Sequence, residues 1–337
     1  MTKRIIAFLA ALMLCVSLTG CAKKETKSVS FFAMDTYITV SVTCDDAEGA
    51  LDWAKNLVET NEKKWSATLP DSFVGRLNAG ERITPDEGTA FILSRAEEMR
   101  AFTNGAFEPK VYPLVRAWGF TTGEYRVPSD DEIGELLKQV VPGSLQTENG
   151  ETFLSGGMID LGGIAKGMTG DMLIRGLRER GVASALINLG GNVQALGAKA
   201  DGSAWRIGIQ SPYDDGVMGV VSVKDRCVIT SGAYERYFVG DDGQVYGHII
   251  SPFTGRPAQS GLVSVSVIAD EGAAADALST ALFVMGEKAA LEFWKTHEGF
   301  DLVLLSESGT LYVTEGVWDD FEKRSCGAVK QVCEIKR

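Results

Sequence analysis

Hydrophobic positions along the chain form short alternating and helical patterns that follow one another in no fixed order. Alternation with β-branched residues predicts a strand over residues 32–42, and apolar residues at helical spacing predict a helix from 45 to about 65. The same patterns predict further strands at 185–189, 263–268, 302–305 and 310–313, and further helices at 84–103, 273–285 and 287–295. Because strands and helices are interleaved without a strict β-α-β order, the pattern favours an α+β fold with mixed and antiparallel sheets and packed helices.

Capping signals and prolines refine these boundaries. Thr84 with Glu87 three residues later forms a capping box, and Ser129 with Glu132 predicts the start of another helix. Two prolines confine the segment 105–115 to an extended or edge conformation. Because no linker rich in glycine, proline or serine divides the chain after its N-terminal region, we expect a single domain.

A glycine-rich segment at 160–170 reads DLGGIAKGMTG. An apolar lead-in ends at Asp160, two glycines follow, and Lys166 precedes a region of helical spacing that ends near Gly181, which predicts a strand, a glycine turn and a helix. Glycines let a backbone approach a ligand closely, and free N–H groups at a helix start favour anions. The alternative is a turn that only packs a helix on a sheet. The segment has neither the Gly-Lys-Ser/Thr of a P-loop nor the Gly-x-Gly-x-x-Gly of a dinucleotide site.

The charge of the chain limits its partners. The 337 residues include 45% hydrophobic and 23% charged residues, with a formal net charge of −12. Without residues 1–20 the chain has 31 basic and 45 acidic residues, a net charge of −14. Such an acidic chain is a poor non-specific ligand for nucleic acid, and a phosphate ligand would need a metal ion or helix termini to offset the repulsion.

The N-terminal region is typical of a bacterial lipoprotein. Lys3 and Arg4 precede an apolar run over residues 5–18, which is followed by Leu18-Thr19-Gly20-Cys21. This tetrapeptide resembles a lipobox, whose cysteine is lipidated and becomes the first mature residue. We therefore expect a signal peptide at 1–20, a tether at 21–30 and a domain at 31–337, held outside the cytoplasm on the cell membrane or its periplasmic face by lipid on Cys21. The alternative is an ordinary signal peptide with a chance cysteine.

Four further cysteines remain in the expected mature chain: Cys44, Cys227, Cys326 and Cys333. None forms a Cys-x-x-Cys motif or has a histidine nearby, so a metal site of cysteines is not expected. An oxidising compartment permits disulfides, and Cys326–Cys333 is the most plausible local pair, although three pairings are possible.

Five stretches together resemble the ApbE family of lipoproteins, the FAD:protein FMN transferases. They are AMDT at 33–36, GAFEPKVYPLV at 105–115, DLGGIAKG at 160–167, HIISPFTGRP at 248–257 and DALSTALFVMG at 276–286. The resemblance covers residues 31–311 with the motifs in family order. It implies a single T-fold-like catalytic domain that transfers FMN from FAD to a threonine or serine hydroxyl of an acceptor protein, with Mg²⁺ as cofactor and AMP as product. Acceptors of the family are typically subunits of membrane redox pumps and related flavoproteins.

The resemblance also implies a metal site. Asp276 and Thr280 are four residues apart on a predicted helix, so their oxygens lie on one face. By resemblance they bind Mg²⁺, which prefers oxygen ligands, together with the carbonyl of Gly163. Asp276 therefore counts among the catalytic residues. The alternative is that Asp276 only sits in the first turn of its helix and Thr280 hydrogen-bonds to its own backbone.

The remaining site residues also follow from the resemblance. Asp160 and Lys166 are expected to contact FAD, the carboxylate through a hydroxyl or amine and the cation through phosphate. The flavin and adenine pocket is expected to include Met34, Ala106, Phe107 and Glu108, although such apolar residues are more often part of a core.

His248 is a candidate base or phosphate donor, and Ile250, two residues on in a strand, is expected to lie on the same side against the flavin. A histidine with an ordinary structural role in a strand is the alternative. The chain departs from the family pattern in two places. Ser251 stands where the family usually has an aspartate, and Thr68 stands where several members have an aromatic residue.

Two other functions remain open from the sequence. The same site would serve an FAD pyrophosphatase, in which water replaces the protein hydroxyl and the products are FMN and AMP. A lipid-anchored flavin-binding protein without turnover is the third hypothesis, and mere binding would not require Asp276 and Thr280.

Overall fold

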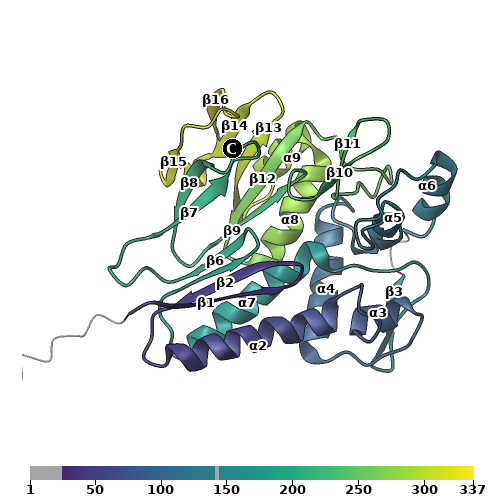
Figure 1. Cartoon of the computed structure of the whole chain (residues 1–337), viewed down its shortest axis with the longest axis horizontal. Helices are drawn as coiled ribbons and strands as arrows, with labels where there is room; N and C mark the ends of the chain where they lie inside the picture. Colours follow the sequence, from purple (N-terminus) through teal and green to yellow (C-terminus); the bar gives the residue numbers. More distant parts are fainter. Residues whose placement is uncertain (1–24, 141–143) are drawn as a thin grey trace, which may run out of the picture.

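The computed structural model describes residues 25–140 and 144–337. The predicted signal peptide and Cys21 lie outside these residues. A nine-stranded sheet forms the centre of the described fold (Figure 1). Its strands are, in spatial order, β1 (Lys27–Ala33), β2 (Thr36–Val42), β5 (Ala185–Leu189), β6 (Asn192–Leu196), β9 (Cys227–Gly232), β12 (Leu262–Ala269), β13 (Phe300–Ser306), β14 (Thr310–Thr314) and β16 (Gln331–Ile335). Neighbouring strands are antiparallel except the parallel pair β14–β16, which confirms the predicted mixed α+β fold.

Helices and a small sheet cover the two faces of this central sheet. The longer helices are α2 (Ala47–Trp65), α4 (Glu87–Phe102), α7 (Gly162–Glu179), α8 (Gly272–Met285) and α9 (Glu287–Thr296). They share apolar clusters with one face of the sheet, to which Val265 and Val267 contribute. A three-stranded sheet of β15 (Phe321–Lys323), β8 (Val217–Val223) and β7 (Trp205–Gln210) packs on the opposite face, where Ile268 and Val303 point (Figure 1).

Shorter elements complete the described chain. They are α3 (Phe73–Asn78), the 3₁₀ helix η1 (Pro109–Val111), α5 (Tyr112–Ala117), α6 (Asp130–Leu137), α10 (Glu315–Trp318), β3 (Leu145–Glu148), β4 (Glu151–Leu154), β10 (Tyr237–Val239) and β11 (Val245–Gly247). Within residues 25–140 and 144–337, no helix has both the length and the apolar character needed to cross a membrane.

Two adjacent helices, α7 and α8, approach each other closely enough to fix the site. A Cβ atom on Gly167 would lie 2.2 Å from the carbonyl oxygen of Gly272, so only glycine fits at this crossing. Across the contact, the N–H of Gly167 donates a 2.9 Å hydrogen bond to Oδ2 of Asp276. The glycine-rich segment is therefore a helix start packed against the helix that contains the predicted metal ligands.

Two predictions near the N-terminus of the described chain are partly wrong. The predicted strand at 32–42 is the hairpin β1–β2, because Met34 and Asp35 form its turn with positive φ angles of 51° and 59°. Such a turn usually contains Asn-Gly or Asp-Gly, so Met-Asp gave no turn signal. The last four residues of the predicted tether, 27–30, also belong to β1.

The proline-containing segment 105–115 is not extended. It contains η1 and the start of α5, and each of these helices has a proline in its first turn. Proline is tolerated there because the first N–H groups of a helix make no hydrogen bond within the helix. The lead-in to α7 is not a strand either, since the side chain of Asn78 pairs with the N–H and carbonyl of Ile159 at 2.7 and 2.8 Å. The N-cap of α4 is Asp86 rather than Thr84.

The predicted Cys326–Cys333 disulfide is not present. Cys326 instead places its Sγ 3.2 Å from the hydroxyl oxygen of Ser211, while Cys333 lies in β16. In the buried interior, Cys227 donates to the carbonyl of Ala269 at 3.1 Å, and burial raises the pKa of this thiol to about 12. Such a thiol is inert as a nucleophile.

Candidate functional site

The three predicted metal ligands meet where α7 begins beside α8. A Cβ atom on Gly163 would lie 3.6 Å from Oγ1 of Thr280, so the backbone of Gly163 adjoins that hydroxyl. Asp276 lies one turn earlier on α8 and accepts the N–H of Gly167. In a regular helix the N–H of Gly167 donates to the carbonyl of Gly163. A carbonyl oxygen has two lone pairs, so the Gly163 oxygen can still bind a second partner. The arrangement therefore presents a carboxylate, a hydroxyl and a carbonyl together.

Asp276 does not lie in the first turn of its helix, as the first part of the structural alternative expected. Helix α8 begins at Gly272, and its first N–H groups, of Gly272 and Ala273, donate to the carboxylate of Asp171 at 2.7 and 2.8 Å. Asp276 is therefore not needed as a cap. The hydroxyl of Thr280 donates a long, weak hydrogen bond of 3.4 Å to the carbonyl of Asp276, so the second part of the alternative, a bond to its own helix backbone, is present.

Lys166 lies among the acidic groups of the site. Burial raises the pKa of the Asp276 carboxyl, and the positive charge of Lys166 opposes this effect. Burial likewise raises the pKa of Asp160, opposed by the N–H of Gly162 at 2.8 Å and then by Lys166. Asp160 and Asp276 thus both lie near Lys166, although Asp276 comes from a different motif, more than a hundred residues further along the chain.

His248 follows β11 and faces Arg236. Its Nδ1 lies 3.2 Å from the carbonyl oxygen of Arg236, so a proton on Nδ1 is donated there and Nε2 is left for another partner. Burial and then the positive charge of Arg236 lower the pKa of His248 to about 4, so the ring is neutral at neutral pH. The predicted strand through His248 and Ile250 is wrong, because β11 ends at Gly247 and Ile250 forms only an isolated bridge with Pro257. Ile250 is buried in an apolar cluster with Trp118 and Leu114.

The tip of the β1–β2 hairpin is held against the same region. The N–H of Met34 donates to Oε1 of Glu62 at 2.8 Å, and Asp35 forms a 2.9 Å ion pair with Arg236. Because the carbonyl of Arg236 contacts His248, Arg236 links the hairpin tip to this histidine.

The segment Ala106–Phe107–Glu108 lies at the start of α7. The ring of Phe107 is 3.1 Å from the position of a Cβ atom on Gly163, so the two are in contact, and Ala106 is buried beside them in the main core. Glu108 is also buried, accepts the backbone N–H of Lys110 at 3.1 Å and lies 3.6 Å from its Nζ. Its carboxylate is therefore engaged within the protein.

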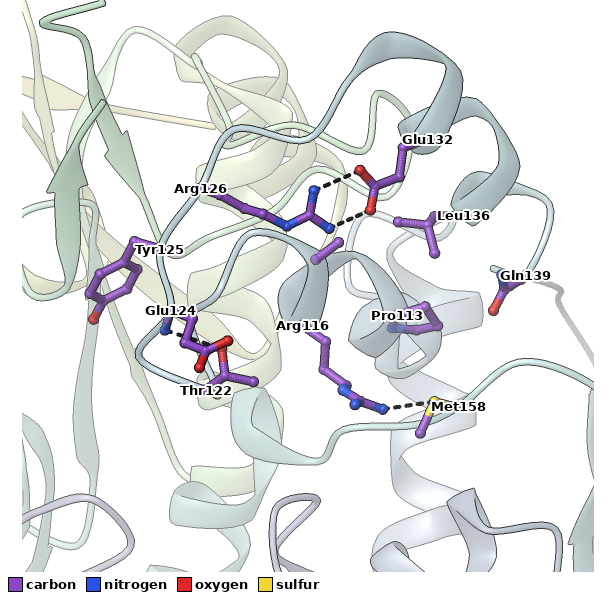
Figure 2. A pocket seen from close by; sticks show the side chains of 11 residues that line it. Pro113, Arg116, Thr122, Glu124, Tyr125, Arg126, Glu132, Leu136, Gln139 and Met158 are labelled. Atoms are coloured by element: carbon purple, nitrogen blue, oxygen red, sulfur yellow. Dashed lines mark hydrogen bonds and ion pairs between the residues drawn. The ribbon is translucent and has the colours of Figure 1, made fainter. Parts of the chain in front are cut away.

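Two cavities lie outside this group of residues. One of about 600 Å³ is lined by α5, α6 and the loop between them, with Arg126 paired to Glu132 and Arg116 directed toward Met158 (Figure 2). A second, of about 490 Å³, lies beside α7 and includes Asp171. No predicted site residue lines either cavity.

Within the described part of the chain, no three histidine, cysteine, aspartate or glutamate side chains gather as a metal site. The predicted set differs in kind, because it combines one carboxylate with a hydroxyl and a backbone carbonyl. Oxygen donors of this kind fit Mg²⁺, which keeps several of its waters.

The model of the ApbE family matches residues 34–304. The chain belongs to the ApbE family. It is similar to the FAD:protein FMN transferase of Treponema pallidum, with 33% identity over 296 residues covering 81% of this chain and 82% of that protein. The FAD:protein FMN transferase of Haemophilus influenzae is 30% identical over 359 residues, 99% of each chain.

Solved structures of the ApbE family have the same fold. The ApbE protein of Thermotoga maritima matches with a TM-score of 0.82 and 33% identity, covering 87% of this chain and 98% of that one. The flavin transferase ApbE from Vibrio cholerae matches with a TM-score of 0.75 and 26% identity, covering 91% and 99%. The predicted family and the single-domain fold are thus confirmed.

The two departures from the ApbE pattern have local explanations. Ser251 donates its N–H to the carbonyl of Arg256 at 2.8 Å and accepts the N–H of Gly255 at 2.8 Å, so backbone bonds close this loop without an aspartate. Thr68 is exposed and pairs with the hydroxyl of Ser66 at 2.9 Å, so it offers no ring for stacking.

Sequence reasoning missed several polar residues of the site. Glu235 faces Lys166 and Asp276, and partial removal from water raises the pKa of its carboxyl to about 7, although the residue as a whole is exposed. Arg236 and Asn192 also lie here. Glu235 and Arg236 lie in SGAYERY, and Asn192 lies in LGGN. Both sequences resemble ordinary turns, so the sequence alone does not assign these residues to the site.

Proposed function

We propose that this protein transfers FMN from FAD to a threonine or serine hydroxyl of an acceptor flavoprotein, with Mg²⁺ as cofactor and AMP as product. The names of its relatives support this reaction. The single observation that carries the proposal is the meeting of Asp276, Thr280 and the Gly163 backbone beside Lys166, where α7 begins against α8. The acceptor is expected to be a membrane redox-pump subunit or a related flavoprotein.

The reaction exchanges one phosphorus–oxygen bond for another. The acceptor oxygen bonds to the phosphorus of the FMN half, while the bond from that phosphorus to the bridging oxygen breaks and AMP leaves with this oxygen. Such transfers depend mainly on positioning and on stabilising negative charge. Mg²⁺ held by Gly163, Asp276 and Thr280 would neutralise charge on the phosphoryl oxygens.

The protein's own residues supply the remaining functions. Lys166 lies near the carboxyls of Asp160 and Asp276 and offers a positive charge to the diphosphate. His248 is neutral, and its Nε2 can take the proton of the acceptor hydroxyl. A bound diphosphate would offset the positive charges that lower the pKa of His248 and make it a better base.

One experiment separates the three candidate functions. The purified protein is incubated with FAD and Mg²⁺, with and without an acceptor protein, and AMP, FMN and protein-bound flavin are measured. The proposal predicts AMP and an equal amount of bound flavin only with the acceptor. AMP with free FMN in its absence favours the pyrophosphatase, and no AMP under any condition favours a flavin-binding protein.

Thr280→Val is expected to raise the Mg²⁺ concentration needed for half-maximal AMP release several-fold, because it keeps the side-chain shape and removes one neutral oxygen ligand. The maximal rate should fall less than it does when Asp276 is removed. AMP release is measured against Mg²⁺ concentration.

The matched control is Thr169→Val on α7, where the hydroxyl accepts a 3.2 Å hydrogen bond from Asn61 inside the core. This variant should lower Tm slightly and leave the Mg²⁺ requirement unchanged. An unchanged requirement in Thr280→Val as well would remove Thr280 from the metal site.

We also propose that the mature protein is held outside the cytoplasm by lipid on Cys21. Cys21→Ala should leave the protein unlipidated, because a thiol is needed for the thioether-linked lipid. Membrane and soluble fractions are compared by immunoblotting. Membrane partitioning equal to that of the parent would contradict the lipobox interpretation.

A further inference from the structure

Asn192 occupies a buried position at the edge of the site. It is the first residue of β6 and pairs with Leu189 across a two-residue turn, Gly190 and Gly191, whose φ angles are 63° and 86°. A Cβ atom on Gly190 would lie 2.0 Å from Oγ1 of Thr36, so the turn packs tightly against the start of β2. The hairpin thereby holds Asn192 in place, with only 1% of its surface exposed.

The side chain of Asn192 faces α7 and α8. Successive side chains of a strand alternate between its faces, so Asn192 shares a face with Gln194. Gln194 donates a 2.9 Å hydrogen bond to the carbonyl of Gly167, at the crossing of the two helices. Asn192 itself reaches the carboxylate of Asp276 through a side-chain hydrogen bond, which lowers the pKa of that carboxyl.

The contact of Asn192 with Asp276 has poor geometry, and neither polar atom of the carboxamide, Nδ2 or Oδ1, has a well-aligned hydrogen-bond partner. Buried polar groups are almost always satisfied, and an unpaired amide in the interior lowers the stability of the fold. An apolar side chain of similar size would avoid this cost. An occupant that supplies a donor to Oδ1 and a further acceptor to Nδ2 would satisfy this amide.

We propose that Asn192 is a binding residue for the hydrated Mg²⁺–diphosphate group of FAD. Its Nδ2 would donate to a phosphoryl oxygen, and its Oδ1 would accept from a water of the cation. A neutral amide suits this place, because a second carboxylate beside Asp276 would repel the phosphoryl oxygens. The inference rests on the proposed function, since it takes the diphosphate to lie next to Asp276 and Lys166.

Affinity and stability are expected to change in opposite directions when Asn192 is replaced. Asn192→Leu keeps the branched shape and removes both polar atoms, and Asn192→Ala removes them without the risk of overpacking. The Kd of the purified full chain for FAD is measured by flavin fluorescence at saturating Mg²⁺. The Kd for ADP, a diphosphate without the flavin, is measured by calorimetry. Both Kd values should rise about tenfold or more, as two hydrogen bonds to charged groups are lost. Tm without ligand should stay equal or rise by a few degrees.

The matched control lies on the same hairpin. Asn188 is exposed, and its Oδ1 accepts the N–H of Gly191 at 2.9 Å. Asn188→Ala should lower Tm slightly and leave both Kd values unchanged.

Three results would overturn the inference. Unchanged Kd values in both Asn192 variants would mean that only an ordered water meets the amide. A large fall in Tm with unchanged affinity of the folded fraction would mean a purely structural role. Failure of the parent itself to bind FAD with Mg²⁺ would refute the proposed function, whereas the first two results leave that function standing.

Discussion

Asp276→Ala is expected to lower the rate of Mg²⁺-dependent AMP release from FAD by about two orders of magnitude or more, roughly the loss of one strong electrostatic contact to the transition state. The carboxylate is the charged member of the proposed metal set, in which Thr280 and the carbonyl of Gly163 are neutral. Rates are measured with FAD, Mg²⁺ and acceptor, and Tm is recorded for the same samples. FAD binding should be less affected than turnover, because Lys166 and Asp160 remain.

The fold is expected to survive this change. Burial raises the pKa of Asp276, which means that its charged form is unfavourable in the folded protein, and alanine removes that penalty along with the hydrogen bond from Gly167. Asp276→Asn keeps the volume and one acceptor oxygen, so it should lose rate almost as much while retaining Tm.

Asp171→Asn is the matched control for a buried carboxylate nearby. This side chain caps α8 through two N–H groups, and burial raises its pKa to about 6. We expect a change in Tm without a change in the Mg²⁺ requirement. Normal turnover in Asp276→Ala, or a loss explained entirely by unfolding, would show that the metal assignment is wrong.

Sequence patterns predicted the parts of the fold in which local signals are strong. Helices α8 and α9 and strand β5 were located to within two residues, because their periodicity is clear and glycine ends α8. The hairpin at Met34 and the helix at 112–117 were not predicted. The residues of the hairpin turn and those of the first turn of α5 are also common in other conformations. Tertiary packing therefore decides which conformation they adopt, and the local sequence does not.

Some members of the candidate site were named from the sequence, but their geometry was not predicted. The spacing of Asp276 and Thr280 places both on one face of a helix, and the ApbE resemblance named Lys166 and Asp160. That these groups meet depends on the crossing of α7 and α8 at Gly167, between segments more than a hundred residues apart. A sequence pattern contains no information about such a contact, nor about the amide of Asn192 that it buries.

Lys110→Met is expected to cause the largest loss of stability, about 3–5 kcal/mol, or a fall in Tm of roughly 10 °C. Lys110 is fully buried and pairs with Glu97 and Glu108. Methionine fills a similar volume but removes the strongest counter-charge of the buried Glu108 carboxylate and leaves only the weaker effect of Arg100. Thermal unfolding of the variant and the parent measures the difference.

The control is Lys138→Met. Lys138 forms a 2.6 Å ion pair with Glu135, and each of these two side chains is 71% exposed. Exposed pairs contribute at most about 1 kcal/mol, so Tm should barely change. Adding Glu108→Gln to Lys110→Met should recover part of the lost stability, because the uncompensated charge is removed. No recovery would indicate that packing of the lysine, rather than its charge, stabilises this region.

The loss of stability in Lys110→Met should also depend on pH in a defined direction. Burial raises the pKa of Glu108, and in the parent the charge of Lys110 is the strongest effect that opposes this rise. Without it, the carboxyl of the folded variant should titrate higher still above its unfolded value of about 4.3. A raised pKa in the folded state means that stability is retained at low pH and lost as pH rises through the folded value. The difference in Tm between parent and variant should therefore be smaller at pH 5 than at pH 8. A difference that is equal at both values would show that Glu108 is not the group left uncompensated.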